Sequence, residues 1–503
     1  MSAATDGARE AVAAYLETAR WFGGKGRDPE VSDVRRCAVL DGRPHGGPRV
    51  GIELVTVGYA DGDVETYQMP LAYYAAEQER LEHALVGSWH DDELGPVLAY
   101  DGVHDREAAA LYLRAFDEAA RSEDLTLRSG ALTFRRLPGH ELDLDSHSTL
   151  FSGEQSNSSL AFGEDSLMKV FRKVTPGRNP DIVIHQALTE SASEHVAALF
   201  GWVELDDPAG GDDPVHLAML QQFLRTASDG WQIALASVRD LFAEADLHAG
   251  EVGGDFAGEA ERLGLATAQV HDVLASQFPT ETWGAADLSA VSEAMLGRLD
   301  AALTVVPELA AFADGLREVF RGVAELGASG ISATAQRVHG DYHLGQTLRT
   351  TRGWKIVDFE GEPAKPLEER VRPDLVWRDV AGMLRSFDYA AHAVMTDFET
   401  DDDASAQIAF RAAEWGQRNT SAYLRGYADN SDRTAGGELS DQQRSILSAY
   451  VADKAVYEAV YEARNRPTWL PIPLGALARI TRQSQPSTDT QPSKHSDQEA
   501  TTA

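Results

Sequence analysis

Apolar and polar positions near the N-terminus predict a small unit that mixes helix and strand. Apolar residues recur with helical spacing over residues 11–19, which favours a short amphipathic helix. Residues 50–57 and 64–71 are β-like apolar runs on either side of turn-forming residues 60–63, so we expect a hairpin there. We assign residues 1–90 to this unit, which we interpret as an N-terminal cap subdomain of α+β type.

The next part of the chain combines short helices, strands and a polar loop. Residues 151–162 are rich in Ser, Asn and Gln, and the apolar strand 167–171 follows them with Lys169 in its middle. Backbone N–H groups and small hydroxyls in such a loop can approach phosphates closely. A lysine in mid-strand can reach phosphates as a point charge, although a lysine that keeps an edge strand soluble is the alternative interpretation. The loop candidates for phosphate binding are Ser156, Asn157 and Ser158.

Helical periodicity dominates the second half of the chain. Residues 259–274 and 288–306 have the spacing of amphipathic helices. We expect residues 91–224 to complete a first lobe and residues 225–482 to form a mainly helical second lobe. Residues 483–503 are rich in Ser, Thr and Gln and are expected to form a disordered tail.

Composition limits the functions that fit these elements. The chain has 503 residues, of which 43% are hydrophobic, with 80 acidic against 45 basic residues and a formal net charge of −35. Such a charge disfavours binding to nucleic acid or to anionic membranes. Cys37 is the single cysteine, and no run of about 18 apolar residues is present. We therefore expect a cytoplasmic protein, a monomer, without a membrane or nucleic-acid partner.

A short polar motif in the second half carries the candidate chemistry. His339, Gly340 and Asp341 form a turn, Gln346 follows five residues after Asp341, and Asp358 ends a short apolar run. Kinases need one carboxylate that positions the substrate hydroxyl and accepts its proton, and an amide and a second carboxylate that hold Mg²⁺ on the nucleotide phosphates. We assign the base to Asp341 and the metal ligands to Gln346 and Asp358, with Glu360 as a further oxygen donor. A hairpin with polar residues at its tip is the alternative interpretation.

The same stretch resembles a known family. Residues 339–346 are similar to the catalytic loop of the aminoglycoside-phosphotransferase-like kinases, with Gln346 where most members have Asn. Residues 358–363, 366–367 and 378–387 extend the similarity to the bacterial maltokinases. The resemblance implies a two-lobed, protein-kinase-like α/β fold with an N-terminal cap.

The resemblance also implies an activity, with ATP and a small-molecule sugar as partners and Mg²⁺ as cofactor. The expected reaction is phosphorylation of maltose at its anomeric hydroxyl, which gives maltose 1-phosphate. A glucosamine or other monosaccharide kinase on the same scaffold is the main alternative. An aminoglycoside phosphotransferase and a non-catalytic pseudokinase are further alternatives.

Several site residues are implied by the resemblance. Lys169 would bind the α- and β-phosphates, and Asp379 would brace the catalytic loop beside His339, although Asp379 could equally cap its helix. Maltokinases have Glu where this chain has Val183, so the acid that pairs with the lysine could be Asp181 or Glu190.

The remaining assignments concern the two substrates. Backbone groups at the end of the apolar strand 218–224 would meet the adenine edge, and an ordinary crossing from strand to helix is the alternative. Those residues are Gln222, Phe223 and Leu224. Aromatic and charged side chains suit sugar binding, although core packing is the alternative for each of them. The candidates for the sugar are His343, Arg385, Tyr423, Tyr457, Glu458, Tyr461 and Arg464.

Overall fold

The computed structural model describes residues 2–3, 6–45, 47–151, 156–243, 248–251, 253–362, 365–396, 402–431, 433–434 and 437–483. The tail that we expected to be disordered lies outside these residues, apart from Gln483. The chain divides into two compact units. The first contains Met1–Gly230, His339–Asp341 and Gly345–Arg372, and the second contains Trp231–Val338, Tyr342–Leu344 and Pro373–Ala503.

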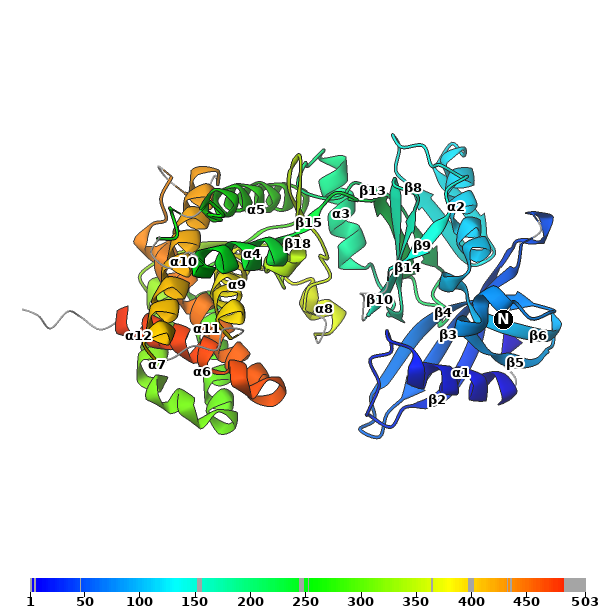
Figure 1. Cartoon of the computed structure of the whole chain (residues 1–503). Helices are drawn as coiled ribbons and strands as arrows, with labels where there is room; N and C mark the ends of the chain where they lie inside the picture. The colour runs from blue at the N-terminus through cyan, green and yellow to red at the C-terminus, as the bar shows by residue number, and fades with distance from the viewer. Residues whose placement is uncertain are drawn as a thin grey trace, which may run out of the picture. The chain divides into compact units, whose positions relative to one another are not determined.

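The first sheet of the first unit contains the strands of the expected cap, residues 1–90, and extends past it with β6 and β12 (Figure 1). Its strands are antiparallel and run in the order β1-β2-β3-β4-β6-β5, with β12 also paired to β4. Apolar residues Val12 and Leu16 of helix α1 pack into a core with Val55 and Met69 of the sheet. The expected hairpin is confirmed as β3 and β4. The bounds are β1 Ser2–Ala3, α1 Asp6–Thr18, β2 Glu30–Asp41, β3 Arg49–Gly58, β4 Val64–Tyr74, β5 Leu85–Asp91, β6 Gly95–Asp101 and β12 Lys173–Val174.

The second sheet carries the strands expected to bind nucleotide. Its order is β7-β8-β13-β14-β11-β10-β9, again antiparallel. Part of the expected polar loop belongs to this sheet, because residues 157–162 form β10. The bounds are α2 Arg106–Ala120, β7 Thr126–Ser129, β8 Leu132–Arg136, β9 Ser148–Leu150, β10 Asn157–Phe162, β11 Ser166–Phe171, α3 Pro180–Glu190, β13 Leu199–Leu205 and β14 Val215–Gln222.

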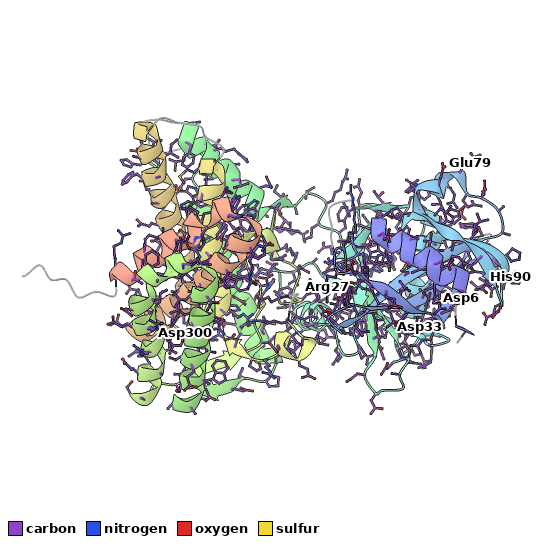
Figure 2. The ribbon with its side chains drawn as sticks, turned by 90° about the horizontal axis from the view of Figure 1, so that it is seen from below. Asp6, Arg27, Asp33, Glu79, His90 and Asp300 are labelled. Atoms are coloured by element: carbon purple, nitrogen blue, oxygen red, sulfur yellow. The ribbon has the colours of Figure 1, made fainter. Side chains whose placement is uncertain are left out.

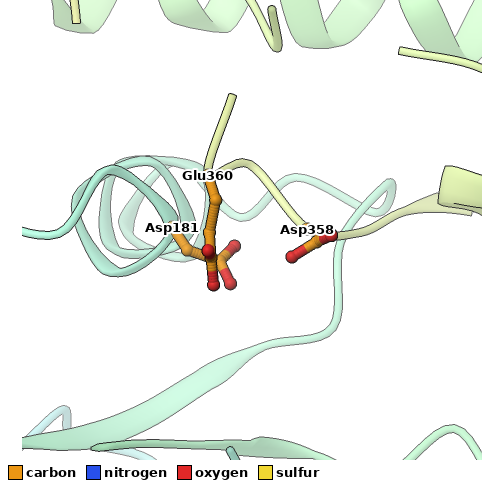
Figure 3. A group of neighbouring side chains, drawn as sticks. All are labelled: Asp181, Asp358 and Glu360. Carbon is orange, nitrogen blue, oxygen red and sulfur yellow. The ribbon is translucent and has the colours of Figure 1, made fainter. Parts of the chain in front are cut away.

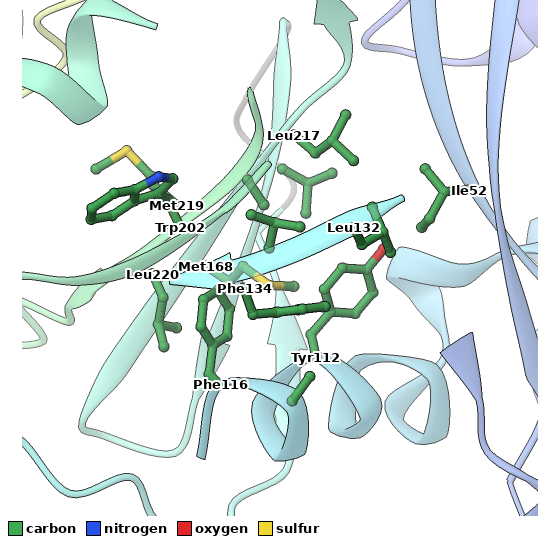
Figure 4. Packing of buried hydrophobic residues seen from close by; sticks show 14 of the residues in the cluster. Ile52, Tyr112, Phe116, Leu132, Phe134, Met168, Trp202, Leu217, Met219 and Leu220 are labelled. Carbon is green, nitrogen blue, oxygen red and sulfur yellow. The ribbon is translucent and has the colours of Figure 1, made fainter. Parts of the chain in front are cut away.

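Large apolar side chains fill the space between this sheet and α2 (Figure 4). Phe116 of α2 meets Phe134 of β8 edge-on, with ring centroids 5.3 Å apart. Met168 and Leu220 belong to the same core, and both are 1% exposed or less. Because Met168 points into this core, Lys169 projects from the opposite face of β11.

Buried polar contacts join the two sheets. The Gln68 side chain on β4 donates to the backbone oxygen of Phe171 at 2.7 Å. Arg172 follows β11 and forms an ion pair with Asp101 at 2.8 Å, and both side chains are fully buried. The Arg172 Nε also donates to Ser158 Oγ on β10 at 2.9 Å. The cap and the second sheet therefore share one interior.

A small third sheet and one short helix complete the first unit. Ser228 and Asp229 form strand β15, in which Ser228 pairs with Arg349 of β18. The sheet order is β15-β18-β19. The bounds are β15 Ser228–Asp229, β18 Thr347–Thr350, β19 Gly353–Ile356 and α8 Leu367–Arg370.

The second unit is mainly helical, and the two expected helices are confirmed as α5 and α6. The backbones of helices α5 and α10 approach closely at Gly426 of α10. A Cβ at this position would lie 1.9 Å from the backbone oxygen of Glu261 on α5. The helices are α4 Gly230–Ala243, α5 Ala257–Gln277, α6 Ala285–Val305, α7 Ala313–Ala328, α9 Trp377–Thr396, α10 Asp402–Asp429, α11 Asp441–Asn465 and α12 Pro471–Gln483. The strands are β16 Glu281–Trp283, β17 Ala333–Gln336 and β20 Asp374–Leu375.

Charged side chains cover the surface of each unit (Figure 2). Asp33 and Glu79 are exposed in the first unit and Asp300 in the second. Among the helices that the structure describes, none combines the length and the apolar content that a membrane crossing requires.

Candidate active site

Lys169 lies among three carboxylates of the first unit. Its Nζ is 2.9 Å from Asp181 Oδ2, 2.7 Å from Asp358 Oδ1 and 2.8 Å from Glu360 Oε1. The three acids converge from two segments, α3 and the turn after β19 (Figure 3). Asn179 caps α3 by accepting from the Asp181 backbone N–H at 2.8 Å, which places Asp181 in the first helical turn. The acid that pairs with the lysine is therefore Asp181 and not Glu190.

Burial and charge act against each other in this cluster. Burial disfavours the ammonium of Lys169, but the carboxylates outweigh it and hold the lysine pKa well above its ordinary value. Burial also acts against ionised Asp181, and the nearby Lys169 nevertheless keeps the pKa of Asp181 low. For Glu360 burial prevails and raises the pKa, although Lys169 opposes it. The cluster thus keeps the Lys169 side chain positively charged, and its third acid, Glu360, is less readily ionised than Asp181.

The turn after β19 positions Asp358 against Gln346. Asp358 has φ +67°, a left-handed conformation that is unfavourable for a residue with a side chain. Its Oδ2 accepts a hydrogen bond from Gln346 Nε2 at 3.2 Å. The Val357 N–H donates to the backbone oxygen of Gln346 at 3.0 Å. The pairing of Thr347 with Ile356 in the β18–β19 hairpin brings these residues together. Two residues that lie twelve positions apart in the sequence are therefore neighbours.

The His-Gly-Asp turn lies beside the same segment. His339 Nε2 is 3.0 Å from the Val357 oxygen, and the Asp341 N–H donates to His339 Nδ1 at 3.4 Å. Gly340 has φ +87°, and a Cβ there would lie 3.4 Å from the Cα of Gly361. His339 is buried and Asp341 is half-buried, so the carboxylate of Asp341 keeps access to solvent. Catalytic candidates and metal candidates thus occupy one region of the first unit.

The donor set fits a divalent cation. Oxygen atoms of Asp181, Asp358 and Glu360 lie within 4.8 Å of one another, and Mg²⁺ prefers oxygen ligands. Asp181 takes part in this cluster, whereas we had expected Gln346 with Asp358 and Glu360. The same oxygens surround Lys169, so a bound cation would share Asp358 with the lysine.

The expected nucleotide residues lie in or after strands of the second sheet. The Asn157 side chain donates to Glu360 Oε1 at 3.2 Å, and the Ser158 hydroxyl is buried against Arg172. Ser156 is exposed at the end of the loop, and residues 152–155 lie outside the described residues. Gln222 ends β14, and the half-buried Phe223 and Leu224 follow it.

The second unit fixes the residues that follow Asp341. The Tyr342 hydroxyl is 2.9 Å from Thr267 Oγ1 of α5, and the Leu344 N–H donates to Ser386 Oγ of α9 at 3.2 Å. His343, a sugar candidate, lies half-buried between them. Asp379 of α9 is buried, and its Oδ2 is 3.1 Å from His271 Nε2.

The other sugar candidates lie on three helices, with Arg385 on α9, Tyr423 on α10 and the remaining four on α11. Arg385 Nε donates to Glu458 Oε2 at 2.8 Å inside the unit, and burial raises the pKa of Glu458 despite this arginine. Tyr457 and Tyr461 are 44% and 45% exposed, and Arg464 is also exposed. Tyr423 is fully buried, with its ring 5.9 Å from that of Phe387. Its burial leaves Tyr423 no surface for a substrate, because the ring fills the contact between α9 and α10.

Glu462 lies one helical turn after Glu458 on α11 and was not among the residues predicted for the site. This glutamate is 1% exposed, and its Oε1 accepts from Tyr389 at 3.1 Å and from Arg466 at 2.8 Å. Its Oε2 is buried and has no hydrogen-bond partner in the part of the chain that the structure describes. Helical spacing from Glu458, four residues earlier, was the signal that could have indicated it.

Two family models match the chain one after the other. Residues 15–105 match the maltokinase N-terminal cap domain, and residues 163–415, half of the chain, match the phosphotransferase enzyme family. The chain belongs to the phosphotransferase enzyme family. The expected kinase-like fold with an N-terminal cap is confirmed, and so is the expected class of enzyme.

Two relatives with similar sequences are glucosamine kinases. The chain is 31% identical over 334 residues to a glucosamine kinase of Streptacidiphilus jiangxiensis. The aligned region covers 64% of this chain and 70% of that protein. It is 27% identical over 333 residues to a glucosamine kinase of Mycolicibacterium smegmatis, with 65% and 78% covered. A solved glucosamine kinase in complex with glucosamine, ADP and inorganic phosphate has a TM-score of 0.64 and 24% identity over 94% of this chain and 98% of that one. This structural likeness supports the fold.

Proposed function

We propose that this protein is an ATP-dependent sugar kinase whose acceptor is glucosamine. The observation that carries the proposal is the cluster of Lys169, Asp181, Asp358 and Glu360 beside the Asp341 turn. A lysine, oxygen ligands for a cation and a solvent-accessible carboxylate are the parts that phosphoryl transfer to an alcohol requires. The glucosamine kinases among its relatives favour an amino sugar over maltose.

Each part of the cluster has a proposed role. Asp341 orients the attacking hydroxyl and accepts its proton, and Lys169 neutralises charge on the phosphates of ATP. Asp358 and Glu360, with Gln346 nearby, supply the oxygen atoms that would hold Mg²⁺. The metal, when bound, adds positive charge where the transferring phosphoryl group is most negative. Positioning and electrostatics thus provide most of the rate enhancement.

Maltose is the second candidate, and the cap favours it. Residues 15–105 match the maltokinase N-terminal cap domain. Phosphorylation would then take place at the anomeric hydroxyl and give maltose 1-phosphate.

An assay of the purified chain with Mg²⁺ and ATP distinguishes the candidates. We expect ADP release with glucosamine at a kcat/KM far above that with maltose or glucose, and NMR of the product identifies the phosphorylated position. A preference for maltose would overturn the proposed substrate. Binding of ATP without turnover of any of the three sugars, or of an aminoglycoside, would instead indicate a pseudokinase.

A further inference from the structure

His185 of α3 is hydrogen-bonded to the residue that pairs with the lysine. It lies one helical turn after Asp181, and its Nδ1 is 2.9 Å from the Asp181 backbone oxygen and 3.0 Å from Asp181 Oδ1. Both of these atoms are acceptors, so Nδ1 carries the proton and donates to both. His185 is 1% exposed, and its Nε2 has no hydrogen-bond partner among the described residues. An unpartnered buried nitrogen lowers stability, so an apolar residue would fold at least as well here but could not donate to Asp181.

Asp181 uses its two oxygen atoms in different directions. Oδ2 accepts from Lys169 at 2.9 Å, and Oδ1 accepts from the Phe359 N–H at 2.9 Å. The donor from His185 reaches the same Oδ1. Two donors on one oxygen atom fix the rotation of the carboxylate, so that the other oxygen faces the lysine.

The ring of His185 begins a row of aromatic contacts that ends at the catalytic turn. It meets the Phe359 ring edge-on, with centroids 5.2 Å apart. Phe359, which is 1% exposed, contacts the ring of His339 at 4.8 Å. His339 in turn accepts from the Asp341 N–H through Nδ1. Packed rings in a close-packed interior transmit a displacement of one to the next.

We propose that His185 is a positioning residue for phosphoryl transfer, with a separable role for each part of its side chain. Its Nδ1–H keeps Asp181 directed at Lys169 and so supports nucleotide binding. Its ring, through Phe359 and His339, keeps Asp341 in place and so supports turnover. The second role rests on the proposed function, in which Asp341 is the base.

Two substitutions separate the roles. His185→Phe keeps an aromatic ring and removes the donor, and we expect the affinity for Mg²⁺–ATP to fall about tenfold with the KM for the sugar unchanged. His185→Asn keeps a donor near the position of Nδ1 and removes the ring, and we expect nucleotide affinity close to wild type with a kcat about tenfold lower. Leu188→Ala is the control on the same helix, because Leu188 is fully buried and its side chain has no polar group that could hold Asp181. It should lower Tm and leave the KM for ATP unchanged.

Calorimetry with a non-hydrolysable ATP analogue measures the first role without any sugar. If the wild type phosphorylates no sugar, the proposed function fails, while the nucleotide measurement still tests His185. Wild-type affinity and kcat in both variants, or changes confined to Tm as in the control, would overturn the inference. ¹⁵N NMR of histidine-labelled wild type provides a test that does not depend on the folding of a variant. We expect the Nδ1-protonated tautomer for His185, and the Nε2-protonated tautomer would overturn the inference.

Discussion

Asp341 occupies a position that a catalytic base requires. It is half-buried and follows a glycine at positive φ, and its own N–H is held by His339. The backbone of the turn is therefore fixed, while the carboxylate keeps access to an acceptor hydroxyl.

Replacement of Asp341 by Asn is the direct test of this role. We expect kcat to fall about 100-fold or more, because the amide keeps the shape of the side chain and cannot accept the proton. The affinity for ATP should stay close to wild type, since Lys169 and Asp358 are untouched. Steady-state kinetics and calorimetry on the same preparation measure both quantities. Turnover near the wild-type level would remove Asp341 from the role of base.

Single residues were predicted best where a motif of fixed spacing was present. His339, Asp341, Gln346 and Asp358 follow one another within twenty residues, and one hairpin turn brings them together. The partner of Lys169 remained open because Asp181 and Glu190 lie at opposite ends of α3. In the structure, Asn179 caps the helix at Asp181, and the backbone N–H of Phe359, a residue distant in the sequence, donates to Asp181. These contacts place Asp181 beside the lysine, and the sequence alone does not reveal them.

Helices and strands with a clear local sequence pattern were predicted, whereas strands that depend on pairing with another segment were not. The hairpin β3–β4 and helices α5 and α6 could be predicted from the sequence, because the two strands are apolar runs and the two helices repeat apolar residues at helical spacing. Strands β10 and β15 were not predicted as strands. Strand β15 has only two residues, Ser228 and Asp229, and depends on its pairing with β18, which is distant in the sequence. Strand β10 begins with the polar residues Asn157, Ser158 and Ser159, which led us to assign the whole segment to a loop although its second half is apolar and buried.

The close approach of α9 to the catalytic segment gives a prediction about an element. A Cβ on Gly382 would lie 2.3 Å from the backbone oxygen of Tyr342, the residue after Asp341. Gly382→Ala should therefore lower the free energy of unfolding by about 1–3 kcal/mol and reduce kcat, because the backbone of Tyr342 has to shift. Thermal unfolding and kinetics check both effects.

Gly297→Ala on α6 is the matched control. A Cβ there meets no atom within 4 Å, so alanine should stabilise the helix by up to about 1 kcal/mol and leave kcat unchanged. Equal behaviour of the two variants would contradict the importance of the contact between α9 and Tyr342.

Charge is the dominant property of the whole molecule. A formal net charge of −35 spreads over two units, while the nucleotide region concentrates a lysine and three acids in one place. An anionic nucleotide approaching an acidic protein depends on a cation to offset the repulsion. Composition alone indicated the surplus of acidic residues. It did not indicate where the protein concentrates its charged groups.

Stabilisation by ligand should therefore depend on the metal. ATP with Mg²⁺ at about 100 times its Kd should raise stability by about 2.7 kcal/mol, whereas ATP with a chelator should raise it much less. Thermal shift measurements on the full chain detect the difference. Asp358→Asn should abolish most of it, and an equal shift with and without Mg²⁺ would contradict the assignment of the cation site.

The ion pair between Arg172 and Asp101 makes the second sheet depend on the cap. A chain without residues 1–105 would keep Arg172 in an apolar interior and lose the carboxylate of Asp101. An uncompensated buried charge of this kind is strongly destabilising. The second sheet is therefore expected to be unstable when it is expressed without the cap.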